Sequence, residues 1–257
     1  MDGILPLELY GQLGGEASPL LIDIRPPAAD GRLFVSAMQR SAAEVTGGAA
    51  EVTAPRRIVL CGDENDAAAQ LADTLRRAGR DAVHLAGGYA AWRAAGLPTR
   101  RTVGATGKWV TRERPKIDRI ACPWLIKRFI EKDPEFLYVP PSDVLKTAEK
   151  TGAIPYDIPG VKFSHVGDKC SFDAFLAEYK LDAPGLDKLA DIVRGADTSR
   201  LELTPQSHGL FAISLGLSHV YTDDHEMLKH GMVMYDALYA WCRHLVGETH
   251  AWPPKME

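Results

Sequence analysis

The stretch RIVLCGDENDAAAQLADTLRRAGRDAVHL, residues 57–85, decides the fold of the N-terminal part of the chain. Its short apolar runs at 58–61 and 82–85 are typical of parallel strands that are covered on both faces. Between them, the apolar spacing over 67–75 predicts a helix that Gly79 ends. The unit is therefore strand, helix and strand with a right-handed crossover, and the fold class is α/β with a parallel sheet.

Cys61 lies at the carboxyl end of the first of these strands, on the turn that leads into the helix. Backbone N–H groups at a helix N-terminus attract anions and favour a thiolate. Cys61 is therefore the first candidate for a catalytic residue.

The composition changes abruptly along the 257 residues. Residues 1–107 contain no lysine and only one of the eight histidines, whereas residues 108–257 contain every lysine and the other seven. The segment 96–107 is rich in turn formers and has no apolar periodicity, which is typical of a linker. We therefore expect an N-terminal domain at 1–100, a linker at 101–107 and a C-terminal domain at 108–257.

Several classes of protein are excluded by the sequence. No apolar run approaches the roughly 18 residues of a membrane span, and the first residues do not form a secretory signal, so we expect a cytoplasmic protein. The four cysteines have neither zinc-type spacing nor the density of a disulfide framework. A net charge of -4 argues against nucleic acid as a partner.

Three motifs in order resemble those of rhodanese domains, over roughly residues 4–98. They are Leu21-Ile22-Asp23-Ile24-Arg25, Cys61 after its strand, and Leu85-Ala86-Gly87-Gly88-Tyr89-Ala90-Ala91-Trp92 followed by Gly96-Leu97-Pro98. The resemblance implies sulfurtransferase chemistry, in which the Cys61 thiolate takes a sulfane sulfur from a donor and passes it on as a persulfide. The expected partner is a small sulfur donor or a persulfide-carrying protein.

The loop after Cys61 departs from that pattern. It reads Cys61-Gly62-Asp63-Glu64-Asn65-Asp66, with three acids and no base. Carboxylates that point into the loop disfavour both a thiolate and an anionic donor, because a like charge raises the thiol pKa. Two interpretations remain open: a sulfurtransferase with an unusual donor, or a rhodanese fold kept for docking or stability with a buried Cys61.

Residues 108–257 are predicted to be a mainly helical α+β domain. Strands are expected at 109–111 and 136–139, and helices at about 122–130, 143–150, 172–180, 186–194, 207–217 and 223–245. The last helix should begin with Asp223 as its cap, because Glu226 follows at the spacing of a capping box.

Several stretches of this half resemble the C-terminal domain of the chromate-resistance ChrB family. They include Asp118-Arg119-Ile120-Ala121-Cys122-Pro123-Trp124-Leu125-Ile126, Phe163-Ser164-His165, and Val193-Arg194-Gly195-Ala196-Asp197-Thr198. Members are similar to proteins of chromate operons, described as chromate-responsive regulators or accessory resistance factors. The usual N-terminal partner of the regulators is not a rhodanese domain, so a DNA-binding role is not carried over.

One candidate site in this half would bind a small oxyanion. Residues 112–132 have four more basic than acidic side chains. If Pro123 takes the first helical position, Cys122 lies at a helix N-terminus, a setting that lowers a thiol pKa. The predicted anion-binding residues are Arg114, Lys116, Arg119, Cys122 and Arg128. The alternative is a charged amphipathic helix with a half-buried cysteine.

The other candidate is a metal site for iron, manganese or zinc. Its predicted ligands are His165, Asp168 and Cys170, which lie within six residues, together with Asp224 and His225 in the first turn of the last helix. The alternative makes His165 a hydrogen-bonded core residue, Asp168 a turn former and the aspartates of the last helix cap residues.

These observations indicate an accessory protein of chromate, oxyanion or metal stress with persulfide chemistry on Cys61. Two other functions remain open. One is a non-enzymatic regulator that senses chromate or a metal, and the other is a metal-dependent enzyme housed in the C-terminal domain.

Overall fold

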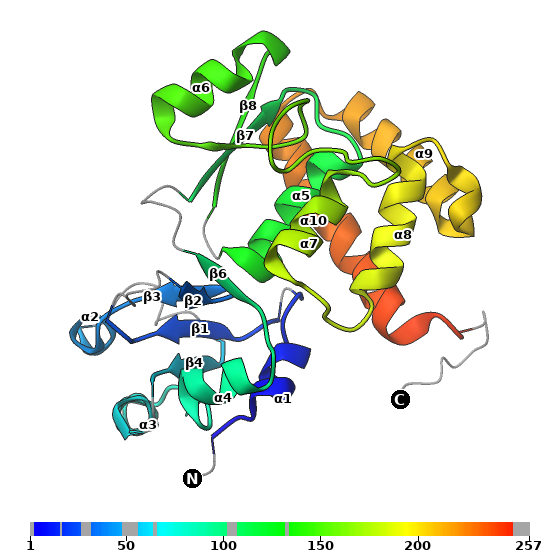
Figure 1. Cartoon of the computed structure of the whole chain (residues 1–257). Coiled ribbons are helices and arrows are strands. Elements are labelled where there is room, and N and C mark those ends of the chain that lie inside the picture. Colours follow the sequence, from blue (N-terminus) through cyan, green and yellow to red (C-terminus); the bar gives the residue numbers. More distant parts are fainter. Residues whose placement is uncertain are drawn as a thin grey trace. The chain divides into compact units, whose positions relative to one another are not determined.

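The computed structural model describes residues 3–15, 17–26, 32–47, 56–63, 66–101, 107–131 and 134–248. The chain divides into two compact units, each described here by itself (Figure 1). The first comprises Met1–Lys108, Leu125–Glu135 and Tyr179–Leu181, and the second comprises Trp109–Trp124, Phe136–Glu178 and Asp182–Glu257. Of the predicted linker, residues 102–106 lie outside the described residues. Within the described ranges, we find no helix with the length and apolarity needed to span a membrane.

A four-stranded parallel sheet forms the centre of the N-terminal unit and confirms the predicted α/β class. Its strand order is β3 (Ala37–Gln39), β1 (Leu20–Asp23), β4 (Ile58–Cys61) and β5 (Ala82–His84). A separate antiparallel pair joins β2 (Arg32–Phe34) to β6 (Thr99–Arg101). The predicted strand–helix–strand unit is β4, α3 (Asp66–Arg77) and β5.

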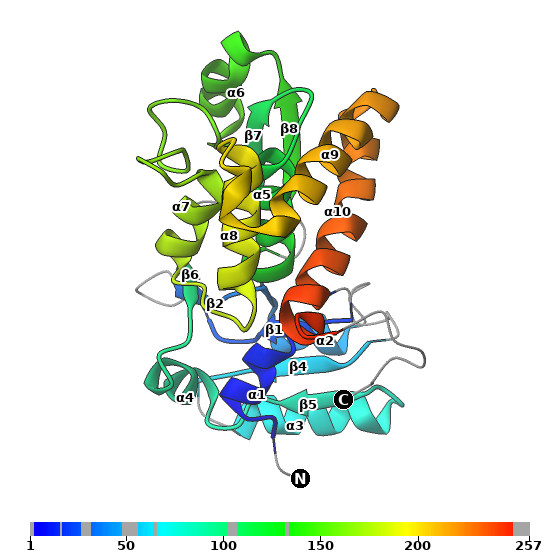
Figure 2. The same ribbon diagram turned by 90° about the vertical axis from the view of Figure 1, so that its right-hand side faces the viewer.

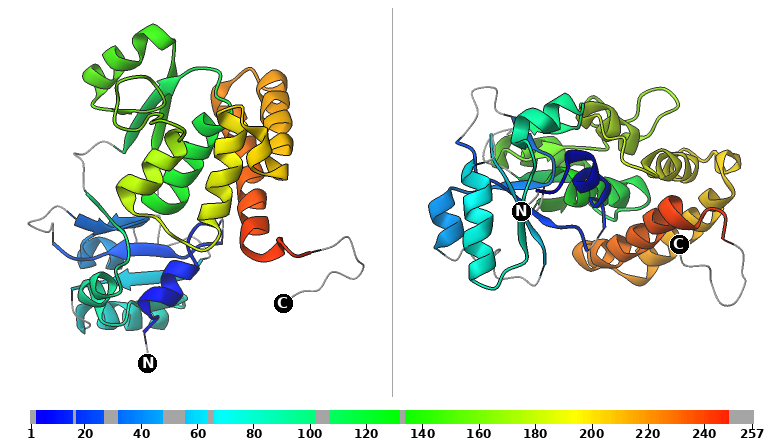
Figure 3. Two further views of the ribbon diagram at one scale, coloured as in Figure 1. Left: turned by 45° about the vertical axis from the view of Figure 1, so that its right-hand side comes forward. Right: turned by 90° about the horizontal axis from the view of Figure 1, so that it is seen from below.

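Helices cover both faces of this sheet because its strands are apolar on both sides. On one face, α2 (Ala42–Thr46) and α3 cover a core to which the strands contribute Leu20, Ile22, Ile58 and Leu60 and α3 contributes Leu71 and Leu75. Short helices α1 (Pro6–Gly11) and α4 (Gly88–Ala94) lie on the opposite side (Figure 3). They are joined by an edge-to-face contact of Tyr10 with Trp92, whose ring centroids are 5.9 Å apart.

The second unit combines a small sheet with a group of helices, which confirms the predicted mainly helical α+β class. The sheet order is β8 (Glu135–Val139), β7 (Lys108–Arg112) and β9 (Ile154–Pro155). The helices are α5 (Asp118–Leu125), α6 (Val144–Thr151), α7 (Ser171–Tyr179), α8 (Leu186–Asp197), α9 (Pro205–Val220) and α10 (Asp224–Ala240). Of these, α5, α7, α8 and α10 lie side by side (Figure 2).

Five of the six helices expected in this half are confirmed with small changes at their ends. Asp223 caps α10 as predicted, since its side chain accepts a hydrogen bond from the Glu226 N–H at 2.8 Å.

The expected helix start at Cys122 is wrong. Helix α5 begins at Asp118, so Pro123 lies inside it, and the chain continues into a π-helical turn at Ile126–Ile130. A tertiary contact fixes this earlier start, because the Tyr235 hydroxyl of α10 donates to the carbonyl of Ile117 at 2.8 Å.

Candidate metal centre

Asp118 is positioned by the start of α5. The Tyr235 hydrogen bond holds the preceding turn, and α10 approaches α5 so closely that a Cβ at Gly231 would overlap the side chain of Ile120. The Oδ2 atom of Asp118 accepts the backbone N–H of Ser171, the first residue of α7, at 3.2 Å. Asp118 is therefore fixed between three helices with its side chain only 2% exposed.

Asp157 enters the same region from the loop after β9. Its backbone has a φ of 52°, in the left-handed region, and its N–H donates to the Phe163 carbonyl at 2.8 Å. Its Oδ2 accepts from Arg112 Nη2 at 2.8 Å and lies 3.2 Å from Arg119 Nε. Its Oδ1 accepts the Ser171 hydroxyl at 3.0 Å, so β7, α5 and α7 all fix this carboxylate.

Asp197 and Cys170 come from the facing ends of two helices. Asp197 ends α8, and Cys170 directly precedes α7. A bidentate ion pair joins these helices, with Arg194 Nε and Nη2 at 2.9 and 2.6 Å from the Asp173 carboxylate. Asp173 also accepts the Cys170 N–H at 3.0 Å, which fixes the thiol beside α8.

These carboxylates converge on one imidazole nitrogen. His165 Nε2 lies 3.3 Å from Asp118 Oδ2, 3.4 Å from Asp157 Oδ1 and 3.1 Å from Asp197 Oδ2. Cys170 lies beside them, since its Sγ and carboxylate oxygens of Asp118 and Asp197 are all within 4.8 Å of one another. We call this set the acidic centre: Asp118, Asp157, His165, Cys170 and Asp197.

The acidic centre has an excess of negative charge in a poorly solvated place. Burial, followed by the charges of Asp118 and Asp157, raises the pKa of Asp197 to about 8. The hydrogen bond with Asp118 raises the pKa of His165 to about 9. Burial and the nearby carboxylates also raise the pKa values of Asp157 and Cys170. Such crowding is what a bound cation would relieve.

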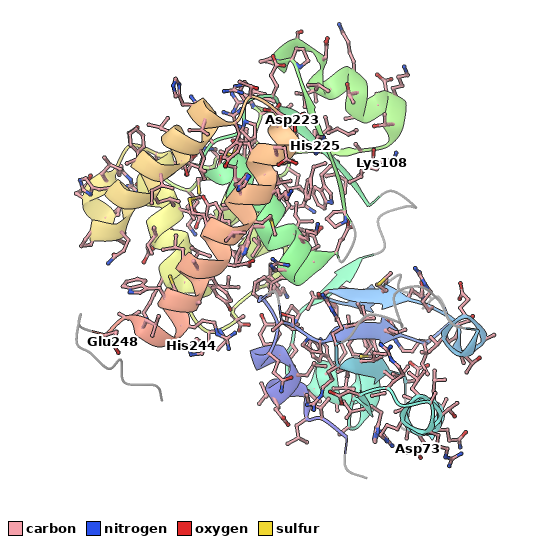
Figure 4. All side chains as sticks on the ribbon, turned by 180° about the vertical axis from the view of Figure 1, so that it is seen from behind. Asp73, Lys108, Asp223, His225, His244 and Glu248 are labelled. Carbon is pink, nitrogen blue, oxygen red and sulfur yellow. The ribbon has the colours of Figure 1, made fainter. Side chains whose placement is uncertain are left out.

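Two of the five predicted metal ligands, His165 and Cys170, belong to the acidic centre, and three lie elsewhere. Asp168 is 85% exposed and pairs with Arg200 at 3.1 Å. Asp224 accepts the Arg114 N–H at 3.1 Å, and the His225 ring contacts Tyr138. Figure 4 shows His225 at the first turn of α10, next to the Asp223 cap.

The prediction missed Asp118, Asp157 and Asp197. They lie in three separate segments, and no local spacing links them. The signal that could have found them is indirect: Asp118 and Asp197 fall within two of the stretches that carry the family resemblance.

Cys122 does not lie at a helix N-terminus, which corrects the basis of the predicted oxyanion site. It is fully buried inside α5, and burial followed by the charge of Asp118 raises its pKa well above the ordinary value. Arg119 pairs with Asp157, and the Arg114 guanidinium donates to carbonyls that include that of Tyr221.

The remaining two predicted anion ligands are Lys116 and Arg128. Lys116 is exposed, and Arg128 lies in the π-helical turn that belongs to the first unit.

In the N-terminal unit, Cys61 ends β4 and is fully buried. Burial raises its thiol pKa well above the ordinary value; the Asp23 charge raises it further, and Arg25 lowers it. The Arg25 guanidinium forms a bidentate pair with Asp23, at 2.9 and 2.7 Å, and lies 3.7 Å from the centre of the Tyr89 ring. Asp63 lies 3.8 Å from Arg25, while residues 64 and 65 of the acidic loop lie outside the described residues.

The fold and the site define a parallel α/β domain with rhodanese motifs, followed by a helix-rich domain with a carboxylate–histidine cluster. Residues 109–242 match the family model described as the ChrB C-terminal domain, and the chain belongs to that family. Protein ChrB of Cupriavidus metallidurans is 32% identical over 148 residues, which is 57% of this chain and 44% of the relative. The chain thus matches less than half the length of that relative.

Solved structures similar to this chain include rhodanese-like proteins. The Alr3790 protein from Anabaena is 25% identical, with 39% of this chain and 82% of that chain covered and a TM-score of 0.35. A rhodanese-like domain protein from Staphylococcus aureus is 19% identical, with 36% and 91% covered and a TM-score of 0.33. The sequence motifs indicated the same resemblance.

Proposed function

We propose that this chain is an accessory protein of chromate, oxyanion or metal stress whose ChrB-type domain acts through a divalent metal ion at the acidic centre. The observation that carries this proposal is the convergence of three carboxylates on His165 Nε2 within 3.4 Å. One N–H cannot donate well to three acceptors. A metal ion bound by His165 can hold all three oxygens at about 2.0–2.2 Å.

The donor set selects the class of metal. Three carboxylates and one imidazole suit manganese, iron or zinc, the metals expected from the sequence. Such an ion would supply Lewis-acid chemistry, either by holding a small oxyanion or by activating a water molecule.

Two features favour access by a small ligand. The His165 side chain is 41% exposed, so the acidic centre has an edge open to solvent. Arg112 and Arg119 lie beside Asp157 and place positive charge next to the site. Cationic side chains with several N–H donors are suited to an oxyanion.

Elemental analysis of untagged protein, purified without chelators, tests the proposal. We expect near-stoichiometric manganese, iron or zinc, which His165→Ala and Asp157→Asn reduce strongly. Asp168→Asn and His225→Ala are matched controls, because they remove the same residue types outside the acidic centre. Metal that persists in His165→Ala, or protein that takes up none of these ions after reconstitution, would refute the proposal.

A second candidate function is persulfide chemistry on Cys61. Its place at the carboxyl end of β4 beside Arg25 favours this function. Because the thiol is fully buried, a donor must first gain access to it. A mass increase of one sulfur atom after incubation with sulfane donors, lost in Cys61→Ser, would support it; no reaction with any donor would exclude it.

A further inference from the structure

We infer that the acidic centre holds two metal ions that share Asp118, and that the second ion is bound through the Cys170 sulfur. This inference rests on the proposed function and extends it to the number of ions and to the sulfur ligand.

The acidic side chains and their neighbours form two overlapping ligand groups. One consists of Asp118, Asp157 and His165, and the other of Asp118, Cys170 and Asp197. Within each group the ligand atoms lie within 4.8 Å of one another. Two-metal sites place their ions about 3.5–4 Å apart and commonly need a ligand between them. Asp118 is the residue that both groups share.

Carboxylate oxygens of Asp118 and Asp197 lie within 4.8 Å of each other and of Cys170 Sγ. Each also has an oxygen near His165 Nε2, at 3.3 and 3.1 Å. The two carboxyl groups therefore border both positions, His165 on one side and Cys170 on the other.

Two buried thiols belong to this part of the second unit, Cys170 and Cys122. Cys170 Sγ forms a weak hydrogen bond with Asp173 Oδ2 at 3.6 Å. Cys122 Sγ is fully buried and, within the described part of the chain, has no hydrogen-bond partner. Burial, followed by the charges of Asp118 and Cys170, raises the pKa of the Cys122 thiol. A soft sulfur ligand favours zinc, iron or cobalt over magnesium or calcium.

Cobalt(II) is the probe, because a thiolate ligand adds a sulfur-to-cobalt charge-transfer band that carboxylates and imidazole do not. We expect two ions per chain and this band in the full-length protein. Asp157→Asn should bind one ion and keep the band, whereas Cys170→Ser and Cys170→Ala should bind one ion and lose it. Asp168→Asn should bind two ions.

The possible results separate the two proposals. One ion per chain without the band would refute the two-metal centre and leave the single-ion site of the proposed function. Two ions in both Cys170 variants would also refute the inference, because the sulfur would then not be a ligand. No cobalt, manganese or zinc bound at all would refute both. Circular dichroism checks that each variant is folded. The charge-transfer band of the unsubstituted protein tests the sulfur ligand even if a variant does not fold.

Discussion

The metal-free protein should lose stability as the pH rises from 6 to 7.5, and Asp197 is the main cause. Its pKa is about 8 in the folded chain and near 3.8 in the unfolded chain, so the folded state binds one more proton throughout this range. Stability therefore falls as the pH rises. His165 acts in the same direction: its stabilisation is complete below about pH 6.5 and is lost as the pH rises through about 9.

The size of the effect follows from one proton per chain. A difference of one bound proton changes the free energy of unfolding by about 1.4 kcal/mol per pH unit, so Asp197 alone gives about 2 kcal/mol over this range. His165 adds less, because a side chain that is 41% exposed is screened by solvent. For a unit of this size, about 2 kcal/mol lowers the Tm by about 4–8 °C.

Urea unfolding of chelator-treated protein at the two pH values measures this effect. Asp197→Asn should remove most of the pH dependence, whereas Asp168→Asn should retain it. Added Mn²⁺ should stabilise the protein more at the higher pH, because its ligands must be deprotonated. Equal stability at both pH values, or an unchanged slope in Asp197→Asn, would refute the reasoning.

Three further predictions concern packing, ion pairing and thiol access. Gly231→Ala should lower the free energy of unfolding by about 1–3 kcal/mol, because its Cβ would overlap Ile120 Cγ2. Adding Ile120→Ala to this variant should restore part of the lost stability. Equal urea midpoints for Gly231→Ala and the unsubstituted protein would contradict this prediction. Arg194→Met should destabilise the protein by about 3 kcal/mol, since it leaves the buried Asp173 carboxylate without its ion-pair partner. Adding Asp173→Asn to this variant should reduce the loss of stability. If Arg194→Met is as stable as the unsubstituted protein, the ion pair does not stabilise the fold. In the folded protein, Cys61 should resist iodoacetamide near neutral pH, because its thiol is buried and its pKa is raised; in urea it should react. The mass of the peptide that contains Cys61 follows the reaction. Rapid alkylation of the folded protein would show an accessible thiolate instead.

The elements of the fold could be predicted where the signal is local. The apolar run at 58–61 and the helical spacing after it gave β4 and α3 almost to the residue, because parallel strands are apolar on both faces. The start of α5 could not be predicted. The start of α5 depends on two contacts from α10, the Tyr235 hydrogen bond and the close packing at Gly231. The residues around position 118 carry no local signal for either contact.

The acidic centre could be predicted only in part, for the same reason. His165 and Cys170 attract attention because they are close together in the sequence, but so does Asp168, which points to Arg200. Asp118 and Asp197 are far apart in the sequence and meet only in the folded chain, where the Asp118 N–H donates to Asp197 Oδ1 at 3.5 Å. Spacing in the sequence therefore indicated the loop that carries His165 and Cys170, but not the three aspartates that lie beside them.

Anomalous diffraction from crystals of the full-length protein grown with Mn²⁺ tests the central claim most directly. The structure predicts a manganese peak bounded by His165 Nε2 and the carboxylates of Asp118, Asp157 and Asp197, at about 2.0–2.2 Å from its ligands. A peak at Asp168 or Asp224 instead, or an unchanged acidic centre without manganese at saturating concentration, would contradict it.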